Sequence, residues 1–91
     1  MVITCHLDCS QMTSRETLHT YLKEQLSLPE YYGCNLDALF DCLTELSQPI
    51  RLEFSNLDEL LPLGNYGKGL LATFRDAALE NPNLELLFSD N

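Results

Sequence analysis

Three short runs of strand-forming residues are spread along the chain, and segments with helical periodicity separate each run from the next. The runs are 2–7, 50–54 and 84–88. Strands joined by a tight turn pair antiparallel, whereas parallel neighbours need a crossover that is long enough for a helix. With right-handed crossovers, this order predicts an α/β fold in which about four helices flank a small three-stranded parallel sheet.

Start signals for helices mark the segments between these runs. Thr13 and Glu16 have the spacing of a capping box, and Asn35 is a favourable N-cap. Ser55 and Asp58 resemble a further helix start. The predicted helices are 14–26, 35–46, 55–61 and 67–80, with a loop over 62–67.

Charge limits the class of partner. The 91 residues predict a single domain over 1–91, and 14 acidic residues against 5 basic ones give it a formal charge of −9. Such a surface repels phosphate, which argues against nucleic acid as a direct partner. It favours a basic protein or a cationic ligand, although acidity also serves solubility alone.

The sequence also bears on compartment. No apolar run approaches the roughly 18–20 residues that a membrane span needs, and the first residues lack the basic start and long apolar core of a signal peptide. We therefore expect a cytoplasmic protein that binds no membrane.

Four cysteines, Cys5, Cys9, Cys34 and Cys42, allow a disulfide or a metal site. In the cytosol reduced thiols are the better expectation. Cys5 and Cys9 with His19 do not match the usual ligand spacing of a zinc site. We therefore predict no bound metal and no cofactor.

The helix after Asn35 carries Asp37, Asp41 and Glu45 four residues apart, which places them in one line on its surface. Like charges at this spacing repel by about 0.2–0.5 kcal/mol per pair. No basic residue lies three or four positions away on this helix to neutralise the line. A cationic partner would relieve the repulsion.

Aromatic residues border this acidic line. Tyr31 and Tyr32 precede the helix, and Phe40 lies at the seam between its leucine side and its acidic side. Taken singly, each fits the edge of a core beside a solvated face. Together, aromatic rings next to unneutralised acids form the pattern of a binding surface with anchors.

Residues 28–44, LPEYYGCNLDALFDCLT, closely resemble the corresponding segment of the barstar family, cytosolic inhibitors of the secreted bacterial ribonuclease barnase. Two weaker similarities follow in the same order, the proline-led run 48–54 and the helical segment 74–77. The likeness runs over most of the chain. The fold it implies, a three-stranded parallel sheet with helices, agrees with the layout predicted above.

The resemblance implies a non-catalytic inhibitor, monomeric by itself, that binds a basic, barnase-like ribonuclease one to one. Asp41 corresponds to the carboxylate that occupies the place of a substrate phosphate, Asp37 to an acid that pairs with an arginine, and Tyr31 to a ring that stacks over the catalytic histidine. Pro49 matches a proline that is cis in the family. Other implied partner-binding positions are Gly33, Asn35, Phe40, Thr44, Asp76 and Glu80.

The chain departs from the family pattern at several of these places. Phe40 stands where barstars have tryptophan, Cys34 replaces an acid, and Asp76 is one methylene shorter than the family's glutamate. The segment 42–49 is one residue shorter. These differences bear on which nuclease is the target and leave the class of function intact.

The residues also allow two other functions. Asp37 and Asp41 could share a proton or hold a divalent cation in a small metal- or proton-handling enzyme. Cys34 lies just before a helix N-cap, where a thiolate is favoured, and could serve as a thiol-based sensor. Against an enzyme, no histidine lies near the two acids in sequence and no phosphate-binding loop is present.

Overall fold

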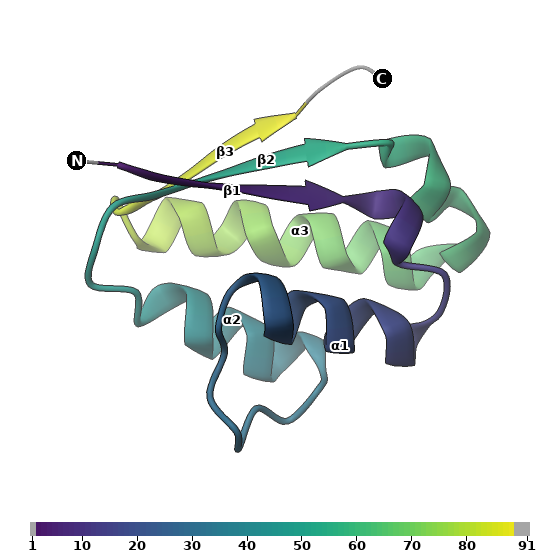
Figure 1. Ribbon diagram of the computed structural model, residues 1–91, viewed down its shortest axis with the longest axis horizontal. Helices are drawn as coiled ribbons and strands as arrows, with labels where there is room; N and C mark the ends of the chain where they lie inside the picture. Colours follow the sequence, from purple (N-terminus) through teal and green to yellow (C-terminus); the bar gives the residue numbers. More distant parts are fainter. Residues whose placement is uncertain (1, 89–91) are drawn as a thin grey trace.

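The computed structural model describes residues 2–88. Its three strands form one parallel sheet with β2 in the centre. The predicted α/β fold with a three-stranded parallel sheet is thus confirmed (Figure 1). In chain order the elements are β1 (Ile3–Asp8), the 3-10 helix η1 (Cys9–Gln11), α1 (Arg15–Gln25), α2 (Leu36–Thr44), β2 (Ile50–Ser55), the 3-10 helix η2 (Leu57–Leu63), α3 (Asn65–Glu80) and β3 (Leu84–Phe88).

Strand register and burial together show which face of the sheet the helices cover. Leu52 of β2 pairs with Cys5 of β1 and Leu86 of β3, so these three side chains share a face. Leu52 and Phe54 are buried on this face, because the helices cover it. In Figure 1 the strands lie above α1, α2 and α3, which places all three helices on one side of the sheet.

Helices α2 and α3 lie side by side and run in the same direction. A Cβ atom on Gly69, near the start of α3, would lie 3.1 Å from the Leu36 side chain at the start of α2. At the other end, the Asn81 amide donates to the carbonyl oxygens of Leu43 and Leu46, at 2.9 and 3.0 Å. The shorter α2 therefore begins beside Gly69, one turn into α3, and the two helices end together. In Figure 1, α3 lies between the sheet and α2.

The N-cap and the first residue of α1 each lie one residue later than predicted. Ser14, not Thr13, is the N-cap: its hydroxyl accepts from the Thr17 amide at 3.2 Å, and Thr17 Oγ1 accepts from the Ser14 amide at 2.9 Å. The capping box is therefore Ser-x-x-Thr and does not use Glu16. The Thr17 hydroxyl takes the place that a glutamate fills in the usual box. Helix α2 has the predicted cap but ends at Thr44.

The predicted loop over 62–67 is wrong, because η2 continues to Leu63 and α3 begins at Asn65. Gly64 supplies the break, with φ at +59°. Gly67 lies inside the helix, where an added Cβ would sit 2.7 Å from the Leu60 carbonyl oxygen. That glycine permits close packing of α3 against η2 and does not end a helix.

The resemblance also led to a wrong expectation at Pro49. No peptide bond within residues 2–88 is cis, so the Gln48–Pro49 bond is trans. The trans form is the intrinsically favoured one even before proline. The Pro49 carbonyl oxygen accepts from the Ile3 amide at 3.3 Å, next to the first paired residues of β1 and β2.

No helix formed by residues 2–88 combines the length and the apolar character that crossing a membrane requires.

Candidate binding surface

Helix α2 separates its apolar and acidic side chains. Leu39 and Leu43 are 0% and 1% exposed, whereas Asp37, Asp41 and Glu45 are all exposed. The intervals of four residues place these acids in a line along the outer side of the helix. The acidic line predicted from the sequence is present.

Two acids of α3 extend this surface. Thr73, Asp76 and Glu80 follow Gly69 at intervals of four, three and four residues, so they lie on the side of α3 that Gly69 presents to Leu36 of α2. Because α2 and α3 end together, Asp76 and Glu80 border the second half of α2. We call the surface formed by Asp37, Asp41, Asp76 and Glu80 the acidic helix surface.

No basic side chain within residues 2–88 forms an ion pair with the acidic helix surface. Arg75, next to Asp76 in sequence, instead places its guanidinium over the Phe88 ring, 5.5 Å from the ring centroid. Among the described residues, ion pairs join Lys23 to Glu30 and Arg51 to Glu85, and His6 lies 3.9 Å from Glu53. No lysine or arginine of residues 2–88 therefore cancels the charge of the acidic helix surface by an ion pair.

The loop before α2 exposes one of its two tyrosines and buries the other. Tyr31 is 85% exposed and Tyr32 only 6%. The Tyr32 amide donates to the Pro29 carbonyl at 2.9 Å, and the Asn35 side-chain amide donates to the Gly33 carbonyl at 3.2 Å. These bonds define the loop, 29–35, as an ordered turn that presents the Tyr31 ring at its surface.

Three other predicted contact residues also serve the fold. Asn35 caps α2, because its Oδ1 accepts from the Ala38 amide at 2.7 Å. Phe40 is half-buried and packs against the core, at the seam predicted for it. Thr44, also half-buried, donates its hydroxyl to the Asp41 carbonyl at 3.1 Å. These residues fix the geometry from which Asp37 and Asp41 project.

Comparison with known proteins bears on this surface. A family model described as "Barstar (barnase inhibitor)" matches residues 2–88. The chain belongs to the barstar family. A protein of Bacillus subtilis (strain 168) named "Putative ribonuclease inhibitor YrdF" is 40% identical to it over 80 residues, which are 81% of this chain and 84% of the relative.

The positions that the barstar likeness singled out are accessible in this structure, with two exceptions. Phe40 and Thr44 are half-buried. The exposed ones are Tyr31, Gly33, Asn35, Asp37, Asp41, Asp76 and Glu80. Their roles in binding a partner remain predictions.

One buried polar residue lies beside the loop, and from the sequence it was considered only as a possible metal ligand. His19 of α1 is 2% exposed, and its ring nitrogens lie 2.6 Å from the hydroxyl oxygens of Tyr32 and Tyr66. Burial, together with the charge of Arg15, lowers the pKa of His19 below its ordinary value. The interval from His19 to Leu22 and Leu26 is helical and indicated an inward position.

The four thiols differ in environment, and none of them forms a disulfide. Burial, with the nearby Asp8 charge, raises the pKa of Cys9 to about 11, and burial also raises the pKa values of Cys5 and Cys42. Cys34 is exposed, with its Sγ 3.7 Å from the Tyr32 carbonyl oxygen. Residues 2–88 hold no cluster of three histidine, cysteine or acidic side chains that could bind a metal ion.

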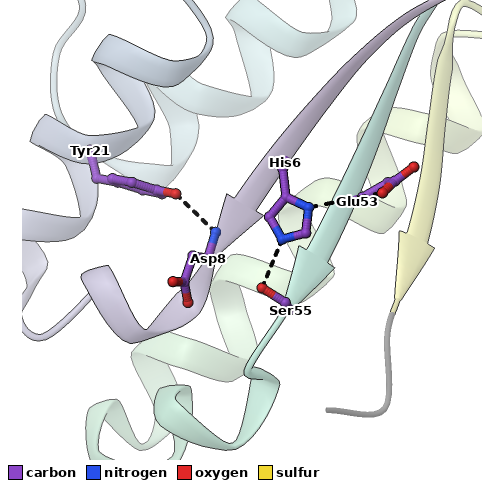
Figure 2. Close-up of polar contacts among 5 residues, drawn as sticks. All are labelled: His6, Asp8, Tyr21, Glu53 and Ser55. Carbon is purple, nitrogen blue, oxygen red and sulfur yellow. Dashed lines mark hydrogen bonds and ion pairs between the residues drawn. The ribbon is translucent and has the colours of Figure 1, made fainter.

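A second group of polar side chains lies on the sheet face away from the helices (Figure 2). His6 Nε2 is 3.0 Å from Ser55 Oγ, and its Nδ1 is 3.9 Å from Glu53 Oε1. The group pairs serine, histidine and glutamate as a hydrolase does, but the His6 side chain is 61% exposed and its distance to Glu53 exceeds a hydrogen bond. This arrangement does not build a catalytic site.

Proposed function

We propose that this protein inhibits a barnase-like ribonuclease by inserting the acidic helix surface and the Tyr31 ring into the cleft that binds RNA phosphates. The observation that carries the proposal is the exposure of Asp37 and Asp41 without any cationic partner among residues 2–88. Membership of the barstar family supports it. The protein would act by blockade, without catalysis or a cofactor, in the cytoplasm where the nuclease would otherwise reach cellular RNA.

The chemistry follows from the charges on both sides. A cleft that binds phosphates presents cations, and arginine bonds carboxylates bidentately as it does phosphate. Asp41 would occupy a phosphate position, Asp37 would pair with an active-site arginine, and Tyr31 would stack over the catalytic histidine. The net charge of −9 would steer an acidic inhibitor towards a basic enzyme.

The remaining contacts would surround these three residues in a complex of one inhibitor with one enzyme. Gly33 is exposed and has no positive φ, and a Cβ there would lie 3.4 Å from Ala38 and Asn35, so the fold itself does not demand a glycine. A partner's backbone could approach closely at this point. Asn35, Phe40 and Thr44 would line the first helix of the interface, and Asp76 and Glu80 would meet basic groups at its edge.

The test compares Asp41→Asn with Glu45→Gln. Both variants remove one negative charge from the same exposed line of α2, but only Asp41 has a proposed partner. Inhibition and affinity are measured by titration against barnase and a panel of related secreted ribonucleases. We expect Asp41→Asn to cost about 2–5 kcal/mol of binding free energy, a range to which barnase–barstar complexes themselves contributed.

Glu45→Gln should change the affinity by no more than about threefold, as expected for a rim charge. Neither variant should lower the free energy of unfolding, because each removes a like-charge repulsion within the line. Equal losses for the two variants would mean that only net charge matters. Unaltered inhibition by Asp41→Asn would refute the proposed mechanism.

A further inference from the structure

We propose that His19, held between Tyr32 and Tyr66, is a positioning residue. It does not touch the partner itself, but it fixes the loop 29–35 and so the placement of Tyr31 against the partner. The inference rests on the proposed function for its effect on binding. Its structural part, that the hydroxyl of Tyr66 helps to hold the loop, can be tested without any partner.

The chain of hydrogen bonds ties three separate segments together. His19 belongs to α1, Tyr32 to the loop and Tyr66 to the first turn of α3. Both nitrogen-to-hydroxyl distances are 2.6 Å, and the histidine ring is 5.7 and 6.0 Å from the two tyrosine rings between centroids. His19 and Tyr32 are both buried, so water does not compete for the bond between them, whereas the bond to the half-buried Tyr66 is only partly shielded.

The bonding pattern suits a neutral imidazole. A neutral histidine donates from one ring nitrogen and accepts at the other, and each tyrosine hydroxyl can take either role. Arg15 supports this state, because its guanidinium lies 4.3 Å from the centroid of the Tyr66 ring. The other ionisable groups that line the space beside His19 are Glu16 of α1 and Cys34 of the loop.

Packing alone does not hold this side of the loop. A cavity of about 470 Å³, lined by Arg15, Glu16, His19, Thr20 and Cys34, lies between α1 and the loop. Beside this open space, the buried Tyr32 side chain attaches the loop to α1. The other attachment, the 3.5 Å ion pair of Lys23 with Glu30, is at the surface, because the Glu30 side chain is 99% exposed. The neighbouring Tyr31 then points outward and is 85% exposed. A loop held in its bound shape loses less entropy on binding.

The experiment compares Tyr66→Phe with Tyr21→Phe. Each variant removes one tyrosine hydroxyl that bonds across elements, but the Tyr21 hydroxyl accepts from the Asp8 amide at 2.9 Å, away from the loop (Figure 2). The first readout, on the unbound protein, is hydrogen exchange by NMR of the Tyr32 amide, which bonds Pro29, and of the Leu52 amide in the central strand.

We expect Tyr66→Phe to speed exchange at Tyr32 roughly tenfold and to leave Leu52 unchanged, as loss of one partly buried hydrogen bond would do locally. Tyr21→Phe should not change exchange at Tyr32. Unaltered exchange at Tyr32 in Tyr66→Phe, or equal acceleration at Tyr32 and Leu52, would overturn the inference, because the second result would mean only global destabilisation.

A double-mutant cycle tests whether the two hydroxyls act through one residue. If His19 couples them, Tyr32→Phe and Tyr66→Phe together should accelerate loop exchange by less than the product of their separate effects. Independent effects would contradict a role for His19 as the link. Variants carrying His19→Gln should then show no further response to Tyr66→Phe.

The second readout is affinity for the ribonuclease inhibited by the parent protein. Tyr66→Phe should weaken binding roughly tenfold, and Tyr21→Phe by less than about twofold. Faster loop exchange with unchanged affinity would refute the role in positioning. If the parent binds no ribonuclease, the proposed function fails, while the exchange measurements still decide whether His19 holds the loop.

Discussion

The two faces of this small protein treat their acids differently. On the outer face of the sheet, Glu53 lies 3.9 Å from His6, and Glu85 accepts a 2.8 Å bond from Arg51. The acidic helix surface on the other side of the molecule has no such partners among residues 2–88. The fold therefore does not use the helix acids, and their like charges cost it a little stability.

This contrast explains why the helix surface, and not the sheet, is the place to expect a partner. A paired acid has already exchanged part of its hydration for a protein contact, whereas an unpaired one keeps its full capacity to bond a cation. The exposed Tyr31 ring strengthens the contrast, because it adds a rigid aromatic anchor beside the acids.

After loss of the Asp41 carboxylate, the largest effect should come from removing that anchor. We expect Tyr31→Ala to cost about 2 kcal/mol or more of binding free energy, the range of interface hot spots, and to change the free energy of unfolding by less than about 0.5 kcal/mol, as for other surface positions. Calorimetric titration and denaturant unfolding measure the two quantities. The control is Leu61→Ala, since Leu61 is a 74% exposed apolar residue of η2, and any comparable loss there would count against a localised interface.

The acids of α3 should contribute less and in another way. For the double variant Asp76→Asn with Glu80→Gln, we expect roughly tenfold weaker binding, or about 1.4 kcal/mol, mainly through slower association and with a shallower dependence on salt. Stopped-flow association rates at two ionic strengths check this. The control, Glu24→Gln with Glu59→Gln, removes the same charge from exposed positions on α1 and η2. If it slows association equally, the electrostatic attraction of the enzyme does not depend on the acids of α3.

Much of this contrast could be predicted from the sequence because it depends on local periodicity. The intervals of four among Asp37, Asp41 and Glu45 predict an exposed line once a helix forms, and the Asn35 side chain starts that helix as expected. The parallel pairing of the strands followed from the helical segments between the three apolar runs.

What the sequence could not supply depends on contacts between distant segments. Tyr32 lies 13 positions from His19, and Tyr66 lies 47 positions from it, so no local pattern joins them. For the same reason, nothing in the pair Tyr31–Tyr32 indicated which ring is buried. Gly67 was predicted to end a loop, because its packing role inside α3 depends on the Leu60 carbonyl of another element. The α3 acids came from family resemblance, because only the packing of Gly69 on Leu36 places them beside α2.

The buried His19 should make the free energy of unfolding depend on pH. His19 has a pKa lowered by burial and by Arg15 from an ordinary value near 6.5, so the unfolded chain binds a proton more readily than the native protein does. The free energy of unfolding should therefore fall as pH drops below about 6.5 and stop falling, for this group, below its native pKa. Urea unfolding across this range measures the effect.

His19→Gln should flatten that pH dependence, and His6→Gln, the control on the exposed sheet face, should preserve it. Asp8 acts in a separate window: bonds from Asn56 and Ser10 lower its pKa, so its contribution is lost only as pH falls below about 3.8. A flat profile in the parent above pH 5 would contradict a neutral, buried His19.

The smallest effect should come from the paired sheet face. Arg51→Gln breaks the bond to Glu85, but both side chains are largely exposed, at 40% and 54%, so we expect a loss of at most about 1 kcal/mol in the free energy of unfolding, which added salt reduces. Lys68→Gln, a charge change at an exposed position of α3, sets the baseline. Affinity for the ribonuclease should not fall in Arg51→Gln, because its charge lies on the face turned away from the helices. A marked fall in affinity would place part of the interface on the sheet. The distinction between a sheet face with paired acids and a helix surface that binds the partner would then be wrong.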